Sequence, residues 1–340
     1  MKLLDKDRLF PTNPKGLGLA RDLFASVRDL PIVSPHGHTD PAWFAKNAPF
    51  ENPAALLVTP DHYVFRMLYS QGIALEDLGI KPIDGTNFET DPREIWRRFA
   101  SHYYLFRGTP SRLWIDYSLQ ELFGVSQVLS HETADEIYDQ VAHSLTQPEF
   151  RPRALFDRFN IDLMATTEGA LDTLEHHDEI AKSDWKGRII TTYRPDTEID
   201  PDHPQFSENL QRLAEITNCD TTTWNGYLDA HRNRRKVFQE HGATATDHGL
   251  CKAKTASLTA AEAEALFKSI ISGTQTPEQA ELFRAQMLTE MAKMSQDDGM
   301  VMQIHPGSYR NHSSGVFRRF GADKGFDIPR RTDYVNDLRP

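Results

Sequence analysis

The sequence predicts an α/β fold, a (β/α) barrel built on parallel strands. After residue 159, short apolar segments typical of strands alternate with longer helical segments, and this alternation implies parallel strands with right-handed crossovers. Polar residues directly follow each of five predicted strands, and in a (β/α) barrel the carboxyl ends of the strands surround one active site. No GxGxxG or GxxxxGK(S/T) sequence is present, so nucleotide-binding α/β folds lose support.

Composition indicates a soluble globular protein, and the cysteines suit the cytoplasm. The 340 residues suffice for one large α/β domain or two ordinary ones, with 39% hydrophobic and 26% charged residues. No run of about 18 apolar residues could span a membrane, and the acidic residues within MKLLDKDRLF argue against a secretory signal. Cys219 and Cys251 form no CxxC pair, which suits a reducing compartment and excludes a cysteine zinc site.

The net charge of −11 argues against nucleic acid as a partner. A small anionic substrate remains compatible with this charge, provided that local arginines overcome the overall field. We therefore expect a small-molecule substrate and no membrane contact, and a homo-oligomer is left open.

The chain is expected to fall into three segments. Residues 1–40 form a lead-in with one helix at 18–28, followed by a first strand, Pro31–Ser34, which we expect to be buried. Residues 41–159 carry helical patterns and no strong strand pattern, which predicts a helical insertion after this strand. Residues 160–340 supply strands two to five and their helices.

Aromatic residues are frequent in the predicted insertion. Trp96, Tyr103 and Tyr104 fit either its core or a face toward a partner subunit. In residues 160–340, strands are expected at 160–167, 188–194, 243–247 and 299–305, and helices at 171–181, 208–217, 224–242, 260–271 and 277–295.

Two histidines follow the first predicted strand. His36 and His38 are separated only by Gly37, and side chains two apart on an extended segment point to the same side. Neutral imidazole is the commonest protein ligand for divalent transition metals. With 14 histidines in the chain, such a pair also arises by chance. The hypothesis gains weight from the polar ends of the other strands, which favour a metal-assisted barrel enzyme.

Several motifs, in order along the chain, resemble those of one known family. They are SPHGHTDP, FENPAALLVTPDHYVFRMLYSQGI, ITTYRPD, ATDHGL and VMQIHPGSYRNH. The sequence resembles the uronate (glucuronate) isomerases of the amidohydrolase superfamily. The resemblance implies a distorted (β/α)8 barrel, of TIM type, with a helical insertion after the first strand. It also implies isomerisation of D-glucuronate to D-fructuronate and of D-galacturonate to D-tagaturonate, with one divalent metal, commonly zinc.

The resemblance also implies roles for individual residues. His36 and His38 match the family's metal-binding HxH. His62 and Tyr63 match a His-Tyr pair that reaches the active site from the insertion and are candidate catalytic residues. Arg194 matches an arginine that holds the substrate. An ion pair with a neighbouring acid is the alternative for Arg194, and packing in the core is the alternative for Tyr63.

Further positions match the same family. His305 matches the histidine after the fifth strand, a candidate catalytic residue, and Arg310 lies in a matching segment as a candidate substrate-binding residue. Asp247 and His248 match a family segment, and their role is left open. The sequence Thr166–Gly169 departs from the acid-rich segment that the family often has at this place.

The matching pattern ends after about five strands. The family's last strand carries an aspartate followed two residues later by an arginine, and no strand here ends in that pattern. We therefore expect a barrel truncated after five strands, a fragment with exposed sheet edges, poor stability and no activity on its own.

Two other functions remain as alternatives. A metal-dependent hydrolase of the same superfamily often carries a lysine at the end of the fourth strand, where this sequence has Thr246, Asp247 and His248. A non-catalytic, truncated barrel is the second alternative. The polar residues at the strand ends count against it.

Overall fold

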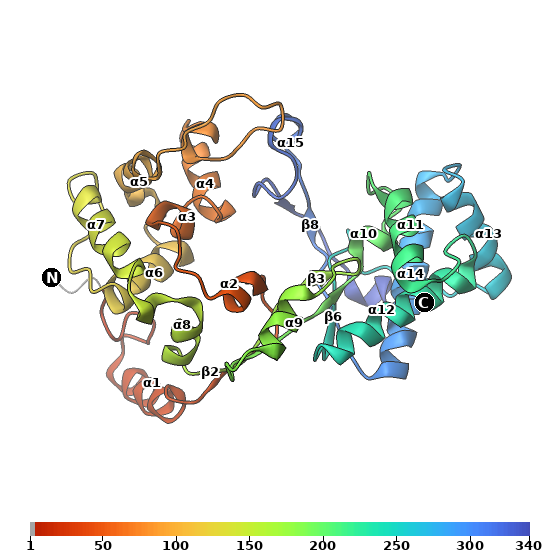
Figure 1. Ribbon diagram of the computed structural model, residues 1–340, viewed down its shortest axis with the longest axis horizontal. Helices are drawn as coiled ribbons and strands as arrows, with labels where there is room; N and C mark the ends of the chain where they lie inside the picture. Colours follow the sequence, from red (N-terminus) through yellow and green to blue (C-terminus); the bar gives the residue numbers. More distant parts are fainter. Residues whose placement is uncertain (1–3) are drawn as a thin grey trace. The chain divides into compact units, whose positions relative to one another are not determined.

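The chain has a mixed α/β fold in two compact units (Figure 1). The computed structural model describes residues 4–340. Unit 1 comprises the residues up to Pro31 together with Asn47–Asn160 and Tyr309–Ile328. Unit 2 comprises Ile32–Lys46, Ile161–Ser308 and Pro329–Pro340.

Unit 1 is helical. Several of its helices begin at residues whose side chains cap them: Asp91, for example, accepts a hydrogen bond from the Arg93 amide, and Pro92 occupies the first helical position. The helices are α1 (Pro14–Val27), α3 (Pro53–Leu57), α4 (His62–Tyr69), α5 (Pro92–Ser101), α6 (Pro110–Tyr117), α7 (Ala134–Leu145), α8 (Pro152–Arg158) and α15 (Ser314–Phe320), with short turns η1 (Glu76–Leu78), η2 (Tyr103–Phe106), η3 (Ser118–Leu122) and η4 (Pro148–Phe150).

Aromatic side chains fill the core of unit 1. Trp96 and Tyr103 are fully buried, so both belong to the core, whereas Tyr104 is exposed. Each buried ring also satisfies its polar atom, as burial requires. The Trp96 indole donates to the Ala134 carbonyl at 2.9 Å, and the Tyr103 hydroxyl donates to Asp116 at 3.0 Å.

Unit 2 is built on parallel strands, as predicted. One sheet has the order β1 (Ile32–Ser34), β2 (Ile161–Ala165), β4 (Arg188–Ile190), and every pair in it is parallel. A second has the order β3 (Glu168–Gly169), β5 (Tyr193–Arg194), β6 (Ala245–His248), β7 (Val301–Ile304), also parallel throughout. The short strands β8 (Ser308–Tyr309) and β9 (Ile328–Pro329) pair with each other.

The expected burial of the first strand is wrong. Ile32 and Val33 of β1 are 48% and 59% exposed. Among the described strands, β1 pairs only with β2 and is therefore an edge of its sheet. Its apolar sequence predicts a strand correctly, but burial depends on neighbours that the local pattern does not specify.

The helices of unit 2 are α2 (Pro41–Lys46), α9 (Glu175–Lys182), α10 (Asp196–Ile199), α11 (Phe206–Thr217), α12 (Trp224–Glu240), α13 (Ala260–Ile271), α14 (Pro277–Asp298) and α16 (Tyr334–Asp337). Among them, α9 packs against β4 and α14 packs against β7. Capping boxes begin α13 and α14. Tyr227, Phe267 and Phe283 are buried in the core of unit 2 and stack on one another. They belong to α12, α13 and α14, which lie close together (Figure 1). No helix within residues 4–340 is long and apolar enough to cross a membrane.

Candidate functional site

The carboxyl ends of four strands in unit 2 bring predicted site residues together. His36 and His38 follow β1, and their ring centres lie 5.0 Å apart with the planes nearly perpendicular. His305 follows β7, and its ring centre lies 6.5 Å from that of His36. Arg194 ends β5 and joins this group through Asp247 of β6.

Asp247 is the buried centre of this group. Its side chain has no exposed surface, His305 Nε2 lies 2.8 Å from its Oδ1, and Arg194 Nη1 lies 3.3 Å from its Oδ2. Neither oxygen has a well-aligned hydrogen-bond partner among the described residues. The contacts are therefore close ion-pair contacts that leave lone pairs of the carboxylate free.

Opposing effects set the charge of Asp247. Burial alone would raise its pKa, but the close contact with His305 and the positive charges of His305, Arg194 and His36 together outweigh burial, so the pKa is lowered. The carboxylate is therefore ionised at neutral pH. The pKa of His38 is also lowered, first by burial and then by the nearby charges of His36 and Arg194. A neutral His38 can use a ring nitrogen lone pair as a ligand.

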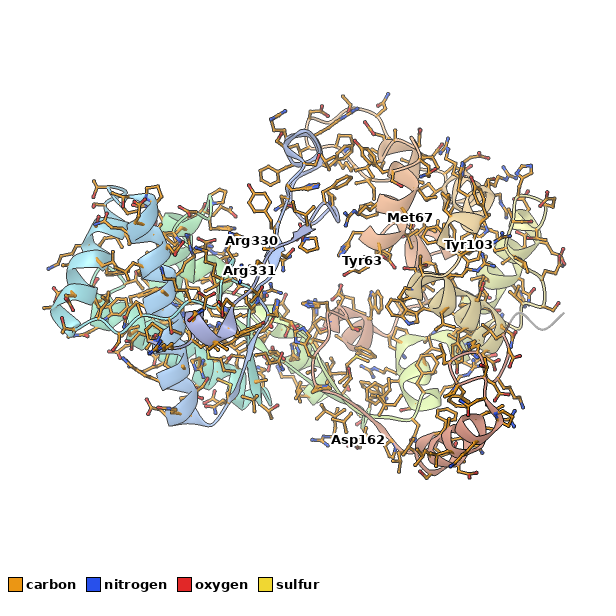
Figure 2. The ribbon with its side chains drawn as sticks, turned by 180° about the vertical axis from the view of Figure 1, so that it is seen from behind. Tyr63, Met67, Tyr103, Asp162, Arg330 and Arg331 are labelled. Atoms are coloured by element: carbon orange, nitrogen blue, oxygen red, sulfur yellow. The ribbon has the colours of Figure 1, made fainter. Side chains whose placement is uncertain are left out.

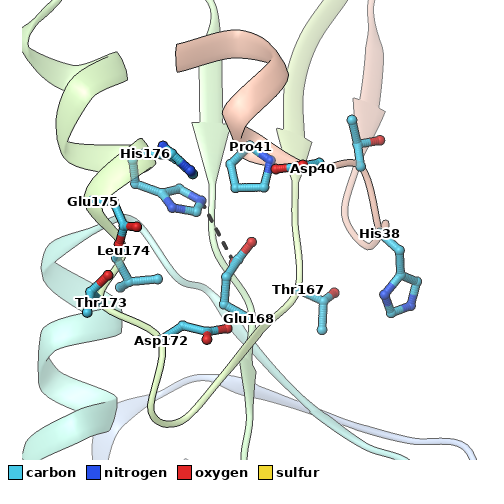
Figure 3. Close-up of a pocket in the computed structure, with 12 residues that line it drawn as sticks. His38, Asp40, Pro41, Thr167, Glu168, Asp172, Thr173, Leu174, Glu175 and His176 are labelled. Atoms are coloured by element: carbon cyan, nitrogen blue, oxygen red, sulfur yellow. Dashed lines mark ion pairs between the residues drawn. The ribbon is translucent and has the colours of Figure 1, made fainter. Parts of the chain in front are cut away.

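A polar cavity of about 370 Å³ lies beside His38 in unit 2 (Figure 3). Glu168 is almost buried at its wall, and burial raises its pKa, while the Thr191 hydroxyl donates to it. His177 Nε2 lies 3.8 Å from the same carboxylate. Such a wall suits a ligand rich in hydroxyl groups. The lining residues are His38, Thr39, Asp40, Pro41, Thr167, Glu168, Asp172, Thr173, Leu174, Glu175, His176 and His177.

Three predicted site residues belong to unit 1. His62 and Tyr63 are the first residues of α4, where Asp61 accepts a hydrogen bond from the Tyr63 amide at 2.8 Å. Their ring centres lie 4.5 Å apart, and Tyr63 is 63% exposed, so it is not part of the core (Figure 2). Arg310 lies 3.5 Å from a carboxylate oxygen of Asp327.

The comparison with known proteins decides the family. A family-wide sequence profile described as glucuronate isomerase matches residues 13–339. The chain belongs to the glucuronate isomerase family. It is 62% identical to the uronate isomerase of Mesorhizobium japonicum and 58% identical to that of Rhizobium meliloti, and each match covers 99% of this chain and 72% of the relative.

Solved structures agree with this family assignment. The crystal structure of glucuronate isomerase from Caulobacter crescentus matches with a TM-score of 0.97 and 54% identity, over 100% of this chain and 71% of that one. The uronate isomerase from Thermotoga maritima matches with a TM-score of 0.90 and 30% identity, over 99% and 72%.

In this member of the glucuronate isomerase family, the sequence left the role of Asp247 open, together with that of His248. Its position at the end of a predicted strand was the available signal, because polar residues at strand ends meet in a parallel sheet. The structure adds that Asp247 contacts both Arg194 and His305. The sequence predicted Arg194 and His305 as site residues, but it did not indicate that Asp247 contacts both of them.

The residues around His36 fit a divalent metal. His36 Nδ1 is buried without a hydrogen-bond partner among the described residues, and a buried polar atom of this kind calls for a ligand. Imidazole nitrogens are suitable donors for zinc and similar ions. Within residues 4–340, no three His, Cys, Asp or Glu side chains are already grouped as a complete metal-binding set.

Glu198, on α10, predicts a pH dependence of stability. Burial raises its pKa from 4.5 to about 7, and its Oε2 has no partner among the described residues. The folded chain therefore binds this proton more tightly than the unfolded chain does, so stability falls as pH rises from 4.5 to 7, by about 3 kcal/mol at most.

Replacing Glu198 with glutamine should flatten this part of the profile. Urea unfolding at several pH values between 4.5 and 7.5 measures the free energy of unfolding for each variant. Glu208→Gln, at an exposed position of α11, is the control. An unchanged slope in E198Q would show that Glu198 is ionised in the folded chain.

Proposed function

We propose that the chain is a uronate isomerase that converts D-glucuronate to D-fructuronate and D-galacturonate to D-tagaturonate. Membership of the glucuronate isomerase family supports this assignment. The structural observation that carries it is the group of Arg194 and His305 around the buried, ionised Asp247, beside His36 and His38. Such a group combines a carboxylate-binding cation with groups that can move protons.

We propose further that His36 and His38 hold one divalent metal, zinc. The unpartnered His36 Nδ1 and the lowered pKa of His38 support this assignment. When bound, the metal would supply Lewis-acid polarisation of substrate oxygens.

The reaction moves a hydrogen from C2 of a 2-hydroxy aldehyde to C1 and requires proton transfer at the oxygens of both carbons. In our proposal, Arg194 binds the uronate carboxylate, because a guanidinium can form two parallel hydrogen bonds with it. His305, held by Asp247 at 2.8 Å, donates a hydrogen bond to a substrate oxygen and moves a proton there.

The remaining role assignments depend on sequence motifs. Tyr63 and His62 are proposed to transfer protons at substrate oxygens, and Arg310 to assist substrate binding. The exposure of Tyr63 leaves its hydroxyl accessible, which is compatible with such a role. The contacts of Arg310 with acids of unit 1 compete with its proposed role.

We also propose that the strands of unit 2 are those of a (β/α)8 barrel of the amidohydrolase type and that the protein acts in the cytoplasm. The pairing order supports the barrel, since β1 pairs with β2, β2 with β4, β5 with β6, and β6 with β7, all in parallel. Each chain segment therefore pairs with the next along the sequence, as in a barrel.

Turnover assays on the zinc-supplemented protein, expressed from its native gene, test this function. We expect D-glucuronate and D-galacturonate to be converted to the corresponding ketoses, which are measured directly as products. We expect no hydrolysis of esters, amides or lactones. Hydrolysis without isomerisation would favour the metal-dependent hydrolase instead. Uronate binding without any turnover would favour a non-catalytic barrel.

A further inference from the structure

Arg194 is held by a second carboxylate besides Asp247. Arg194 Nε donates to Asp196 Oδ2 at 2.9 Å, and Asp196 is the first residue of α10, two positions after Arg194. Both oxygens of Asp196 also accept from the backbone amide of Gly249, at 3.1 and 3.0 Å. Asp196 is therefore fixed by the backbone that follows β6 and in turn fixes one edge of the guanidinium.

Gly249 is required here for space. A Cβ at this position would lie 2.6 Å from Arg194 Nη2, 2.9 Å from Asp196 Oδ2 and 2.9 Å from His305 Cε1. Such distances are far below van der Waals contact, so a side chain would displace the guanidinium or its partner. The absence of a side chain at Gly249 lets the Arg194 guanidinium lie against the backbone there, while its Nε faces Asp196.

Asp196 and Asp247 compete for the same cation. Arg194 Nη1 is already 3.3 Å from Asp247 Oδ2. If the contact with Asp196 were lost, the strongest remaining interaction of Arg194 would be a two-bond pair with Asp247, because a buried carboxylate and a guanidinium favour that geometry. That pair would occupy donors that a substrate carboxylate needs and would disturb the contact between Asp247 and His305.

We propose that Asp196 is a positioning residue that, together with the Gly249 backbone, holds Arg194 off Asp247 and presents it to the carboxylate of the substrate. The proposal rests on the proposed function, since it concerns how that site recognises a sugar acid. Two of the five guanidinium N–H donors face Asp196 and Asp247. The other N–H donors of Arg194 are enough to form the two parallel hydrogen bonds that one substrate carboxylate accepts.

Two variants test this proposal from opposite sides. Asp196→Ala removes the contact that holds Arg194, and Gly249→Ala displaces the guanidinium without any change in charge. We expect either variant to raise KM for D-glucuronate about 10- to 100-fold, since a misplacement of about 1 Å at such a site has effects of this size. We expect kcat to fall less than KM rises in Asp196→Ala. In Gly249→Ala we expect kcat to fall as well, because the new Cβ would also lie 2.9 Å from His305 Cε1.

Ligand binding separates carboxylate recognition from general damage. L-gulonate is D-glucuronate with the aldehyde reduced, and D-glucitol is the same chain with a hydroxymethyl group in place of the carboxylate. By titration calorimetry, we expect both variants to lose L-gulonate affinity by a similar factor, with D-glucitol binding unchanged. Gly315→Ala, where a Cβ meets nothing within 4 Å, and Asp202→Asn, at another Asp–Arg pair, are the controls.

The outcomes distinguish this inference from the proposed function. Tighter L-gulonate binding by D196A would mean that Asp196 only lowers the positive charge at Arg194, and it would overturn the proposal. Equal losses for L-gulonate and D-glucitol would do the same, as would G249A binding like the wild type. If the wild type binds L-gulonate but does not isomerise uronates, the proposed function fails while the positioning role is still measured by binding.

Discussion

Replacing Arg194 with methionine should reduce kcat/KM for D-glucuronate on the order of 10³-fold, the equivalent of about 4 kcal/mol. The loss has two sources. The substrate carboxylate loses its cation, and the carboxylates of Asp196 and Asp247, which are 19% and 0% exposed, lose theirs. An ionised carboxylate left without a partner in such a place is strongly unfavourable. Steady-state kinetics with D-glucuronate measures the effect.

Two further variants make the Arg194 result specific. Arg194→Lys keeps the charge but offers no planar pair of donors, so we expect it to recover only a small part of the activity. Arg284→Met removes an arginine that pairs with Asp200 and Asp202 elsewhere in unit 2 and should leave kcat/KM within about threefold of the wild type, as expected away from the reacting groups. An R194M variant with activity within tenfold of the wild type would contradict the role of Arg194 in substrate binding.

The positions and the parallel direction of the strands were predictable from local patterns. The segments at 243–247 and 299–305 appear as β6 and β7, and they are parallel because a helical crossover joins them. Short apolar runs bounded by polar residues are enough to locate such strands. The same local pattern does not specify which other strands or helices pack over a given strand. For this reason β1 was expected to be buried, whereas its Ile32 and Val33 are exposed.

The pairings within the site depend on register, which the sequence alone leaves undetermined. Asp247 lies opposite Gln303 in the β6–β7 ladder, and the His305 amide donates to the His248 carbonyl. His305 therefore lies two positions beyond the ladder partner of Asp247, on the same face of the sheet. A shift of one residue would turn Asp247 to the other face of the sheet. The contact between Asp247 and His305 could therefore be recognised only in the structure.

Arg194 shows a similar limit. The sequence offered two interpretations, a substrate-binding arginine or an ion pair with Asp196. In the structure the ion pair exists, at 2.9 Å, and Asp247 provides a second carboxylate. The two interpretations are compatible, because a guanidinium has enough donors for its partners and for a ligand. The position of Gly249 beside the guanidinium, with its amide bonded to Asp196, shows how these contacts are arranged.

Replacing His36 or His38 with alanine should remove the metal and reduce kcat by more than about 10³-fold, since a metal that polarises substrate oxygens contributes several kcal/mol. The buried and unpartnered His36 Nδ1 and the two rings 5.0 Å apart are the observations behind this expectation. Metal content after dialysis, measured by plasma mass spectrometry, is a readout independent of activity. We expect one zinc ion per wild-type chain and far less in either variant.

A matched variant and a chelation experiment make the metal prediction decisive. His203→Ala removes a histidine outside the predicted site and should retain both zinc and activity. Treatment of the wild type with a chelator should abolish turnover, and added zinc should restore it, whereas H36A and H38A should stay inactive at the same zinc concentration. If H36A and H38A instead retain one zinc ion each, the metal lies elsewhere. The two histidines would then act on the substrate directly, as donors held by the end of β1.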